Sequence, residues 1–264
     1  MIKLVVSDMD GTLLDDRKQI DPDIYEVLER LKEKRIRFMV ASGRQYPSLL
    51  SLFHAHRQDV VIIAENGAYV TYDGQELYSS VMKRDIVEYS LDCIGKMPNV
   101  EPMLCAREVS YTTNPKTYEI MKSDKFKYKM QLVDNLYDVK DEIIKVSMLD
   151  YDKNGAEGNS FAFLKPLLHQ KAEIAVSGFQ CVDIVNKGVS KGTAIEAMQK
   201  RWGISMEETV AFGDNYNDVE MLQRAAYSFA MANAEPGVQK VARYITGSNN
   251  EGSVVKEIRK LAGI

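Results

Sequence analysis

Two aspartates near the amino terminus have the residue type and spacing of a site that holds a divalent cation beside phosphate. Asp8 and Asp10 stand two residues apart in the segment DMDGT at residues 8–12. Two neighbouring carboxylates need a cation between them or a shared proton. Mg²⁺ suits such a pair because it takes oxygen ligands from one or two carboxylates, and water and substrate phosphate complete its shell. An isolated segment of this kind is as often only a turn before Gly11.

Two further segments carry polar groups that suit the same chemistry. The segment SGR at residues 42–44 offers a hydroxyl, a free backbone N–H and the start of a predicted helix, which together form a natural phosphate cradle. Alone, such a segment is more often a plain turn. The segment GDNYND at residues 213–218 places Asp214 and Asp218 four residues apart, so that one could bind a metal and the other could orient it. The alternative is a helix N-cap, where Asn and Asp are favoured.

Lys191 is the basic residue that we expect to bind an anion. It stands near the start of a predicted helix, where the helix dipole disfavours a cation. The alternative is a solvated surface lysine, and Lys187 competes for the same role. The histidines give no comparable signal, since His54 and His56 lie two residues apart on a predicted helix and point in different directions. A zinc site is therefore not expected.

Short apolar runs predict the strands that position these residues. The runs at residues 2–7, 36–41, 60–64 and 209–212 end at Asp8, at residues 42–44, at residues 65–67 and at residues 213–214. Helices are predicted between them, at residues 22–34, 46–56, 190–202 and 218–225. This alternation indicates an α/β fold with a doubly wound parallel sheet. Because ligands bind outside the carboxyl ends of such strands, we expect remote segments to converge on one crevice.

The middle of the chain has a different pattern of predicted strands and helices. Strands are predicted at residues 143–149 and 173–176 and a helix at 161–169, without regular alternation, which indicates a separate α+β unit. We therefore predict a core formed by residues 1–82 and 186–264 and an inserted cap at residues 83–185, with hinges at its two ends that let it close over the crevice. Three cap residues are possible substrate contacts, although solvated surface is the favoured interpretation for each: Arg107, Tyr111 and Lys129.

The composition excludes several other classes of protein. The chain has 264 residues, 45% of them apolar and 27% charged, with a formal net charge of -4, which is typical of a globular protein. It shows no basic stripe for nucleic acid and no apolar run near the roughly 18 residues of a membrane span. Three scattered cysteines and the lack of a signal peptide predict a cytoplasmic protein. No GxGxxG segment follows the first strand, so a dinucleotide-binding enzyme is not expected.

Taken together, the four segments resemble the motifs of the haloacid dehalogenase superfamily of phosphatases, and within it the Cof-type sugar-phosphatase branch. Residues 8–14 resemble the first motif, 41–44 the second, 191–192 the third and 213–218 the fourth. The resemblance covers the whole chain, and residues 83–185 are similar to the inserted α+β cap of this branch. The fold implied is a Rossmann-like core with that cap.

The resemblance also implies a role for each motif residue. Asp8 attacks phosphorus and forms an aspartyl-phosphate, a known use of carboxylate nucleophiles. Asp10 protonates the leaving oxygen and then activates water. The implied contacts to phosphate or substrate are Ser42, Gly43, Arg44, Lys191 and Asn217. The implied Mg²⁺ ligands are Asp8, the backbone carbonyl of Asp10, and Asp214, with Asp218 supporting the metal site.

The expected function is that of a Mg²⁺-dependent phosphatase for small phosphorylated metabolites such as sugar phosphates, acting as a monomer or a small homo-oligomer. One alternative is a phosphotransferase or phosphomutase that passes the same phosphoryl group to a sugar hydroxyl. Another is a non-catalytic sensor of phosphorylated ligands. The presence of both Asp8 and Asp10 argues against the sensor, because pure binding does not need the second carboxylate.

Overall fold

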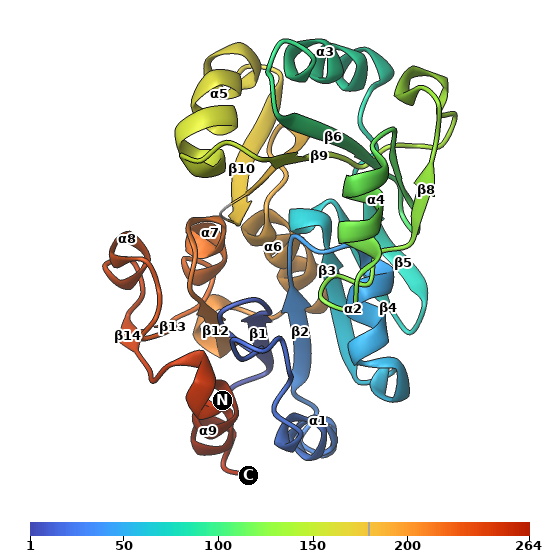
Figure 1. The fold of residues 1–264 in the computed structure, drawn as a ribbon. Helices are drawn as coiled ribbons and strands as arrows, with labels where there is room; N and C mark the ends of the chain where they lie inside the picture. Colours follow the sequence, from blue (N-terminus) through green and yellow to red (C-terminus); the bar gives the residue numbers. More distant parts are fainter. Residues whose placement is uncertain (179) are drawn as a thin grey trace.

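The chain folds around two β-sheets, one above the other (Figure 1). The computed structural model describes residues 1–178 and 180–264. The larger sheet has eight strands in the order β14-β13-β12-β1-β2-β3-β4-β5, and the smaller has six in the order β10-β11-β9-β6-β7-β8. Both termini lie at the end of the larger sheet that is remote from the smaller one (Figure 1).

The larger sheet is doubly wound, as the sequence predicts. Its parallel strands are β1 (Leu4–Asp8), β2 (Arg37–Ala41), β3 (Val60–Ala64), β12 (Thr209–Gly213), β13 (Tyr227–Ala230) and β14 (Tyr244–Ile245). A hairpin formed by β4 (Tyr69–Tyr72) and β5 (Gln75–Ser79) adds two antiparallel strands at one edge. The strand order runs outward from the centre in both directions, so it reverses between β1 and β12, where a ligand crevice is expected.

Amphipathic helices cover this sheet. The helices are α1 (Asp23–Glu33), α2 (Tyr46–Leu52), α6 (Lys191–Trp202), α7 (Val219–Leu222), α8 (Pro236–Gln239) and α9 (Ser253–Ala262). In α1 the apolar residues at helical spacing are the buried ones, and they face the sheet beside α9. The predicted helix at residues 46–56 stops earlier, at Leu52, and gives way to a 3₁₀ turn. The helix predicted at 218–225 is shorter, since it follows a 3₁₀ turn at Tyr216–Asp218 and ends at Leu222.

The smaller sheet has its own helices and its own apolar cluster. Its strands are β6 (Val100–Cys105), β7 (Ser110–Thr112), β8 (Met130–Leu132), β9 (Lys145–Asp150), β10 (Ala172–Gly178) and β11 (Cys181–Asn186), and its helices are α3 (Arg84–Ile94), α4 (Pro115–Lys122) and α5 (Ala162–Leu168). Antiparallel pairing predominates, which fits an α+β unit. The division of the chain at residues 82 and 186 stays a prediction, and we use "cap" for residues 83–185 and "core" for the rest.

The three cap residues singled out from the sequence differ in their surroundings. Tyr111 is buried, with its hydroxyl donating to Asp141, so the expectation of solvated surface was wrong for it. Arg107 is half-buried and pairs with Glu76 of the core and Glu142. Lys129 has the expected exposed side chain. Burial of an aromatic ring with a satisfied hydroxyl is the usual state of tyrosine in a packed sheet.

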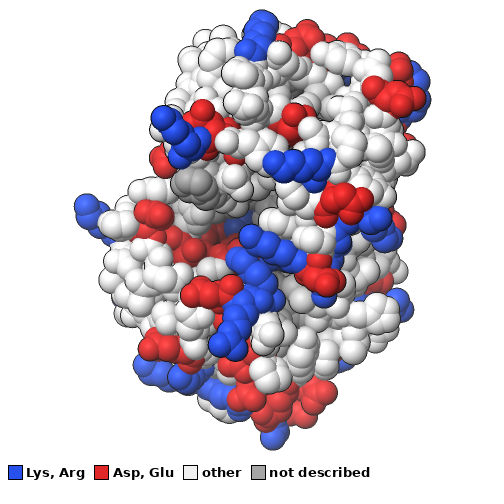
Figure 2. Space-filling model, viewed as in Figure 1, with Lys and Arg blue, Asp and Glu red and all other residues white. Residues whose placement is uncertain are grey.

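The surface carries both signs of charge. On the face shown in Figure 2, basic and acidic side chains lie next to each other at the middle of the molecule, where the cap meets the core. Within the residues that the structure describes, no helix has the length and apolar character that crossing a membrane requires.

Candidate active site

The register of three strands brings the predicted segments together. Asp8 at the end of β1 pairs with Ala41 of β2, and on the other side Ser7 pairs with Phe212 of β12. The segments that follow β2 and β12 therefore flank Asp8 at one edge of the sheet. The convergence of residues 8–12, 42–44 and 213–218 follows from this register, as the sequence predicts.

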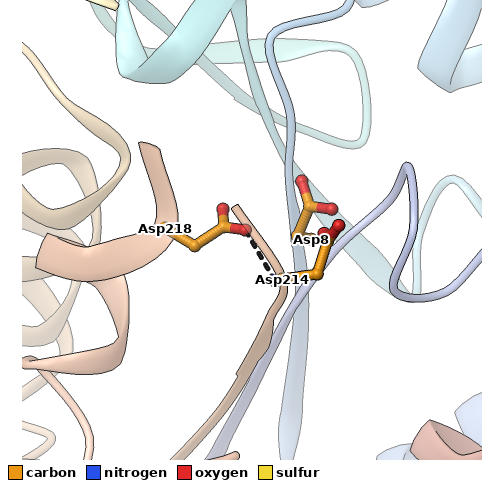
Figure 3. A group of neighbouring side chains, drawn as sticks. All are labelled: Asp8, Asp214 and Asp218. Atoms are coloured by element: carbon orange, nitrogen blue, oxygen red, sulfur yellow. Dashed lines mark hydrogen bonds between the residues drawn. The ribbon is translucent and has the colours of Figure 1, made fainter. Parts of the chain in front are cut away.

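An acidic cluster with a single lysine lies at this edge. Asp8, Asp214 and Asp218 each offer a carboxylate oxygen, and these oxygens all lie within 4.8 Å of one another (Figure 3). Lys191, from the first turn of α6, places Nζ 2.6 Å from Oδ1 of Asp8 and 2.6 Å from Oδ1 of Asp218. Two of the three carboxylates thus contact one ammonium group, and the cluster carries an excess of negative charge.

The pKa values report this excess. Burial, followed by repulsion from Asp218, raises the pKa of Asp8 well above its usual value. The same two causes raise the pKa of Asp214 to about 6. Burial alone would lower the pKa of Lys191, but the nearby carboxylates of Asp218 and Asp8 raise it, so this lysine stays charged. A set of oxygen donors that lacks positive charge fits a hard divalent cation.

The three carboxylates are not equivalent. Oδ2 of Asp218 accepts hydrogen bonds from the backbone N–H groups of Asp214 (3.0 Å) and Asn215 (3.1 Å), while its Oδ1 accepts from Lys191. Asp218 therefore holds its own loop together. Asp214 and Asp8 point toward each other across the end of the sheet (Figure 3), and Oδ1 of Asp214 accepts from the Thr12 hydroxyl at 2.9 Å.

Gly11 makes room for this cluster. Its φ is +83°, and a Cβ at this position would lie 2.3 Å from Oδ2 of Asp214. We expect Gly11→Ala to lower the free energy of unfolding by about 2 kcal/mol or more, since left-handed backbone strain of about 1 kcal/mol adds to a steric clash. Gly74→Ala is the matched control, because Gly74 has φ +73° and no atom within 4 Å. Equal losses for the two variants in urea unfolding would contradict this account.

Asp10 lies beside basic residues and outside the acidic cluster. Its carboxylate accepts from Nε of Arg44 at 2.5 Å, from Nη2 of Arg44 at 2.7 Å and from Nζ of Lys18 at 2.8 Å. Burial alone would raise the pKa of Asp10, but Arg44 and Lys18 outweigh it and lower this pKa to about 2. The assignment of Asp10 to the site stays a prediction, and the sequence gave no sign of Lys18, which lies in a loop without a recognisable motif.

The remaining predicted residues also gather here. Ser42 is buried, and its Oγ accepts from the N–H of Arg44 at 3.1 Å. Asn217 donates to Oδ1 of Asn66 at 3.1 Å. Asn66 was not singled out from the sequence, although it follows the end of β3 and has a φ of +55° that asparagine tolerates well. Lys187 is excluded as a competitor of Lys191, because it is exposed and pairs with Glu173 of the cap.

A cavity adjoins these residues between cap and core. Its volume is about 700 Å³, and Lys191 and Asn217 are part of its core wall. The cap wall comes from the π-helical turn at Glu157–Phe161, from α5 and from β10. A cavity of this size is in the range that holds a small-molecule ligand.

A doubly wound core, an inserted α+β cap and an acidic cluster with a buried lysine at the switch point define a capped hydrolase that handles phosphate. The model of the haloacid dehalogenase-like hydrolases matches residues 5–258. A 5-amino-6-(5-phospho-D-ribitylamino)uracil phosphatase of Escherichia coli is 33% identical over 267 residues, covering 98% of this chain and 96% of that protein. An HMP-PP phosphatase of Klebsiella pneumoniae is 27% identical over 239 residues, covering 89% and 86%.

Solved structures show the same fold. A crystal structure of a protein from Streptococcus mutans superposes with a TM-score of 0.90 at 28% identity, and the match covers 100% of both chains. The chain therefore belongs to the haloacid dehalogenase-like hydrolases, and it is a phosphatase. The family resemblance inferred from residues 8–14, 41–44, 191–192 and 213–218 is confirmed.

Proposed function

We propose that this phosphatase hydrolyses phosphate monoesters of small metabolites in two steps, through an aspartyl-phosphate on Asp8. The observation that carries the proposal is the buried contact of Asp8 with Lys191, opposite Asp214 and next to the turn at residues 42–44. In this proposal, Lys191 binds the phosphoryl oxygens next to the carboxylate of Asp8, which attacks the phosphorus. Uncatalysed monoester hydrolysis is extremely slow, and covalent catalysis divides one difficult displacement into two easier ones.

In the first step, we propose that the phosphoryl oxygens bind to Lys191, to the Ser42 hydroxyl and to the backbone N–H of Gly43, since the N–H groups of Ser42 and Arg44 already donate within the protein. Arg44 is initially bound to Asp10, so an incoming phosphate competes with this carboxylate for the guanidinium. Transfer of Arg44 to the phosphate weakens the interaction that keeps the pKa of Asp10 near 2. Asp10 is then able to hold a proton and to donate it to the leaving oxygen.

In the second step, Asp10, now ionised again, takes a proton from water, which attacks the phosphorus of the aspartyl-phosphate and regenerates Asp8. The position of Asp10 two residues after Asp8 allows one side chain to serve both steps. Asn217 contacts the substrate on the cavity side in this proposal, Arg44 contacts its phosphoryl group, and Gly43 lets the backbone approach the phosphate closely.

We propose that Mg²⁺ completes the site. Its protein ligands are Asp8, Asp214 and the backbone carbonyl of Asp10, and Asp218 supports the loop that carries Asp214. The fit rests on the all-oxygen donor set and on the raised pKa values of Asp8 and Asp214, which show that the cluster needs positive charge. When bound, the ion neutralises phosphate and carboxylate charge and orients the two groups for in-line attack.

The substrate class is small phosphorylated compounds, with sugar phosphates as the first candidates. The cavity of about 700 Å³ supports this, as do the names of the relatives, which act on a ribityl phosphate and on HMP-PP. The test is a phosphate-release screen over sugar phosphates, nucleotides and cofactor phosphates, with Mg²⁺ or with EDTA. If the substrate loses its phosphoryl group only when a sugar acceptor is added, the protein is a phosphotransferase and not a hydrolase. Tight binding of a phosphorylated compound without any turnover would indicate a sensor.

Stabilisation by Mg²⁺ should depend on pH. The pKa of Asp214 is raised from 3.8 to about 6 in the native state, so the metal-free protein holds a proton there that the unfolded chain has lost. Its free energy of unfolding therefore falls as pH rises from about 4 to 6. At pH 7 this carboxylate is largely ionised, and with Mg²⁺ at about 100 times its Kd we expect a gain of about 2.7 kcal/mol or about 5–10 °C in Tm.

The gain should be clearly smaller at pH 5, where protons compete for the carboxylates. Asp214→Asn should lose most of the gain at both pH values, while Asp124→Asn, at an exposed cap residue, should keep it. A Mg²⁺ effect of the same size at pH 5 and pH 7, or one that survives Asp214→Asn, would contradict the assigned metal site.

A further inference from the structure

We infer that Lys145 of the cap is a positioning residue for the phosphate-binding turn of the core, so that this turn is fully ordered only when the cap is docked. Lys145 stands at the start of β9, in the smaller sheet. Its Nζ donates to the backbone carbonyl of Gly43 at 2.7 Å. The inference rests on the proposed function, because it takes residues 42–44 as the turn that binds phosphate.

The carbonyl groups of this turn have partners from two different parts of the chain. The carbonyl of Ser42 accepts from the N–H of Asn66 at 3.0 Å, and that of Arg44 accepts from the N–H of Glu65 at 3.1 Å. Both partners belong to the core. The middle carbonyl, that of Gly43, accepts from the cap through Lys145. Two carbonyl groups of the turn are therefore held by hydrogen bonds from the core, and the third is held by a hydrogen bond from the cap.

Lys145 is held in place by buried charge. It is 1% exposed, and its Nζ lies 2.5 Å from Oε2 of Glu65 and 3.3 Å from Oδ1 of Asp183. Glu65 belongs to the core and is 0% exposed; among the residues described, Lys145 is the cation recorded beside it. A buried carboxylate without a cation is costly. Undocking of the cap would separate Glu65 from its counter-ion, so this ion pair exists only in the docked state.

The same network reaches a second predicted substrate contact. Asp183 of the cap accepts from Ser147 at 2.6 Å and from Nδ2 of Asn66 at 2.5 Å. Asn66 in turn accepts from Asn217 at 3.1 Å. A continuous path of polar contacts thus connects Gly43 and Asn217 on the core through two side chains of the cap. Close packing reinforces it, since a Cβ on Gly43 would lie 3.3 Å from Oδ2 of Asp183.

Other contacts dock the cap without touching the turn's carbonyls. The Gln45 side chain accepts from the N–H of Lys129 at 2.8 Å and donates to Ser110, and Ser48 donates to the carbonyl of Phe126. These bonds hold the cap beside α2. Loss of Lys145 should therefore leave the cap docked at this edge and affect chiefly the order of residues 42–44.

The experiment compares three variants with the wild-type protein. Lys145→Met combined with Glu65→Gln removes one positive and one negative charge, so the net charge of the buried network is unchanged. Lys145→Arg keeps the charge but alters the geometry of the donor, and arginine does not replace lysine at a point contact. Lys96→Met is the matched control, since Lys96 is an exposed lysine of the cap.

The readouts are the affinity for inorganic phosphate, measured by titration calorimetry with Mg²⁺ present, and amide hydrogen exchange in residues 42–45, with residues 4–8 as reference. We expect the double variant to bind phosphate about 10–100-fold more weakly, on the scale that a misplacement of about 1 Å produces. Exchange should accelerate in residues 42–45 and stay unchanged in β1. Turnover should fall by a similar factor for p-nitrophenyl phosphate and for glucose 6-phosphate, because the turn contacts phosphate and not the leaving group.

Wild-type phosphate affinity and wild-type exchange in a folded double variant would overturn the inference. If the double variant does not fold, Lys145→Arg provides the test. Unchanged phosphate affinity in Lys145→Arg would then overturn the inference. Failure of the proposed function gives a different pattern, in which wild-type protein and Lys96→Met release no phosphate from any monoester. Phosphate affinity and exchange would still test the role of Lys145 in that case.

Discussion

Asp8→Asn is expected to reduce kcat for phosphate monoesters by at least about 10⁴-fold, the scale on which loss of a covalent nucleophile acts. Asparagine keeps the shape of the side chain and can still contact Lys191, which retains its bond to Asp218 at 2.6 Å. It cannot form an acyl phosphate by simple attack of a carboxylate oxygen. Turnover under substrate saturation with Mg²⁺ measures the effect, with the exposed Asp124→Asn as control.

The same variant should be at least as stable as the wild-type protein when EDTA removes metal. The pKa of Asp8 is raised in the native state by burial and by repulsion from Asp218, so ionised Asp8 destabilises the fold at pH 8. A neutral amide removes that repulsion. An inactive variant with an equal or higher Tm would show that turnover is lost because the nucleophile is missing and not because the fold is weakened. Residual turnover within tenfold of wild type would refute the role of Asp8 as nucleophile.

Local patterns in the sequence were sufficient to predict the doubly wound sheet and the segments that meet at its edge. Strand β1 is a run of apolar residues that ends at Asp8, and β2 and β12 have the same form, so the ends of three strands could be located without knowledge of the structure. The doubly wound order then requires these ends to meet. For this reason residues as distant as Asp8 and Lys191, 183 positions apart, were assigned to one place correctly.

Interactions between side chains from different parts of the chain could not be predicted in this way. The buried pair of Lys145 with Glu65 joins segments that carry no shared pattern. The segments of Asp10 and Arg44 both follow predicted strands, but their position there does not predict that these two side chains pair. A single lysine is most often a solvated surface residue, so the burial of Lys145 has no local signal. The cap was harder to predict than the core for a related reason, since its antiparallel strands β6 and β11 are neither continuous apolar runs nor regular alternations of apolar and polar residues.

Lys191→Met is expected to lower both stability and activity, because this lysine is the ammonium group among three carboxylates. Without it, Asp8 and Asp218 remain buried with no cation between them. Removal of one partner of a buried ion pair costs about 3–5 kcal/mol, and we expect a loss of this size in urea unfolding with EDTA present. We expect kcat/KM to fall by about 10³-fold, as for other groups that stabilise developing charge.

A compensating variant separates the two effects. Lys191→Met combined with Asp218→Asn removes the ammonium together with one of its carboxylates, and the neutral amide at position 218 leaves Asp8 with one repulsive neighbour fewer. Much of the lost stability should return, while kcat/KM should stay low because no ammonium faces the phosphoryl oxygens. Recovery of activity together with stability would show that Lys191 acts only as a structural counter-ion. A stable and inactive double variant, beside an active Asp218→Asn single variant, would assign to Lys191 a direct contact with the phosphoryl group, for which its place between the proposed nucleophile and the loop of the proposed metal site is well suited.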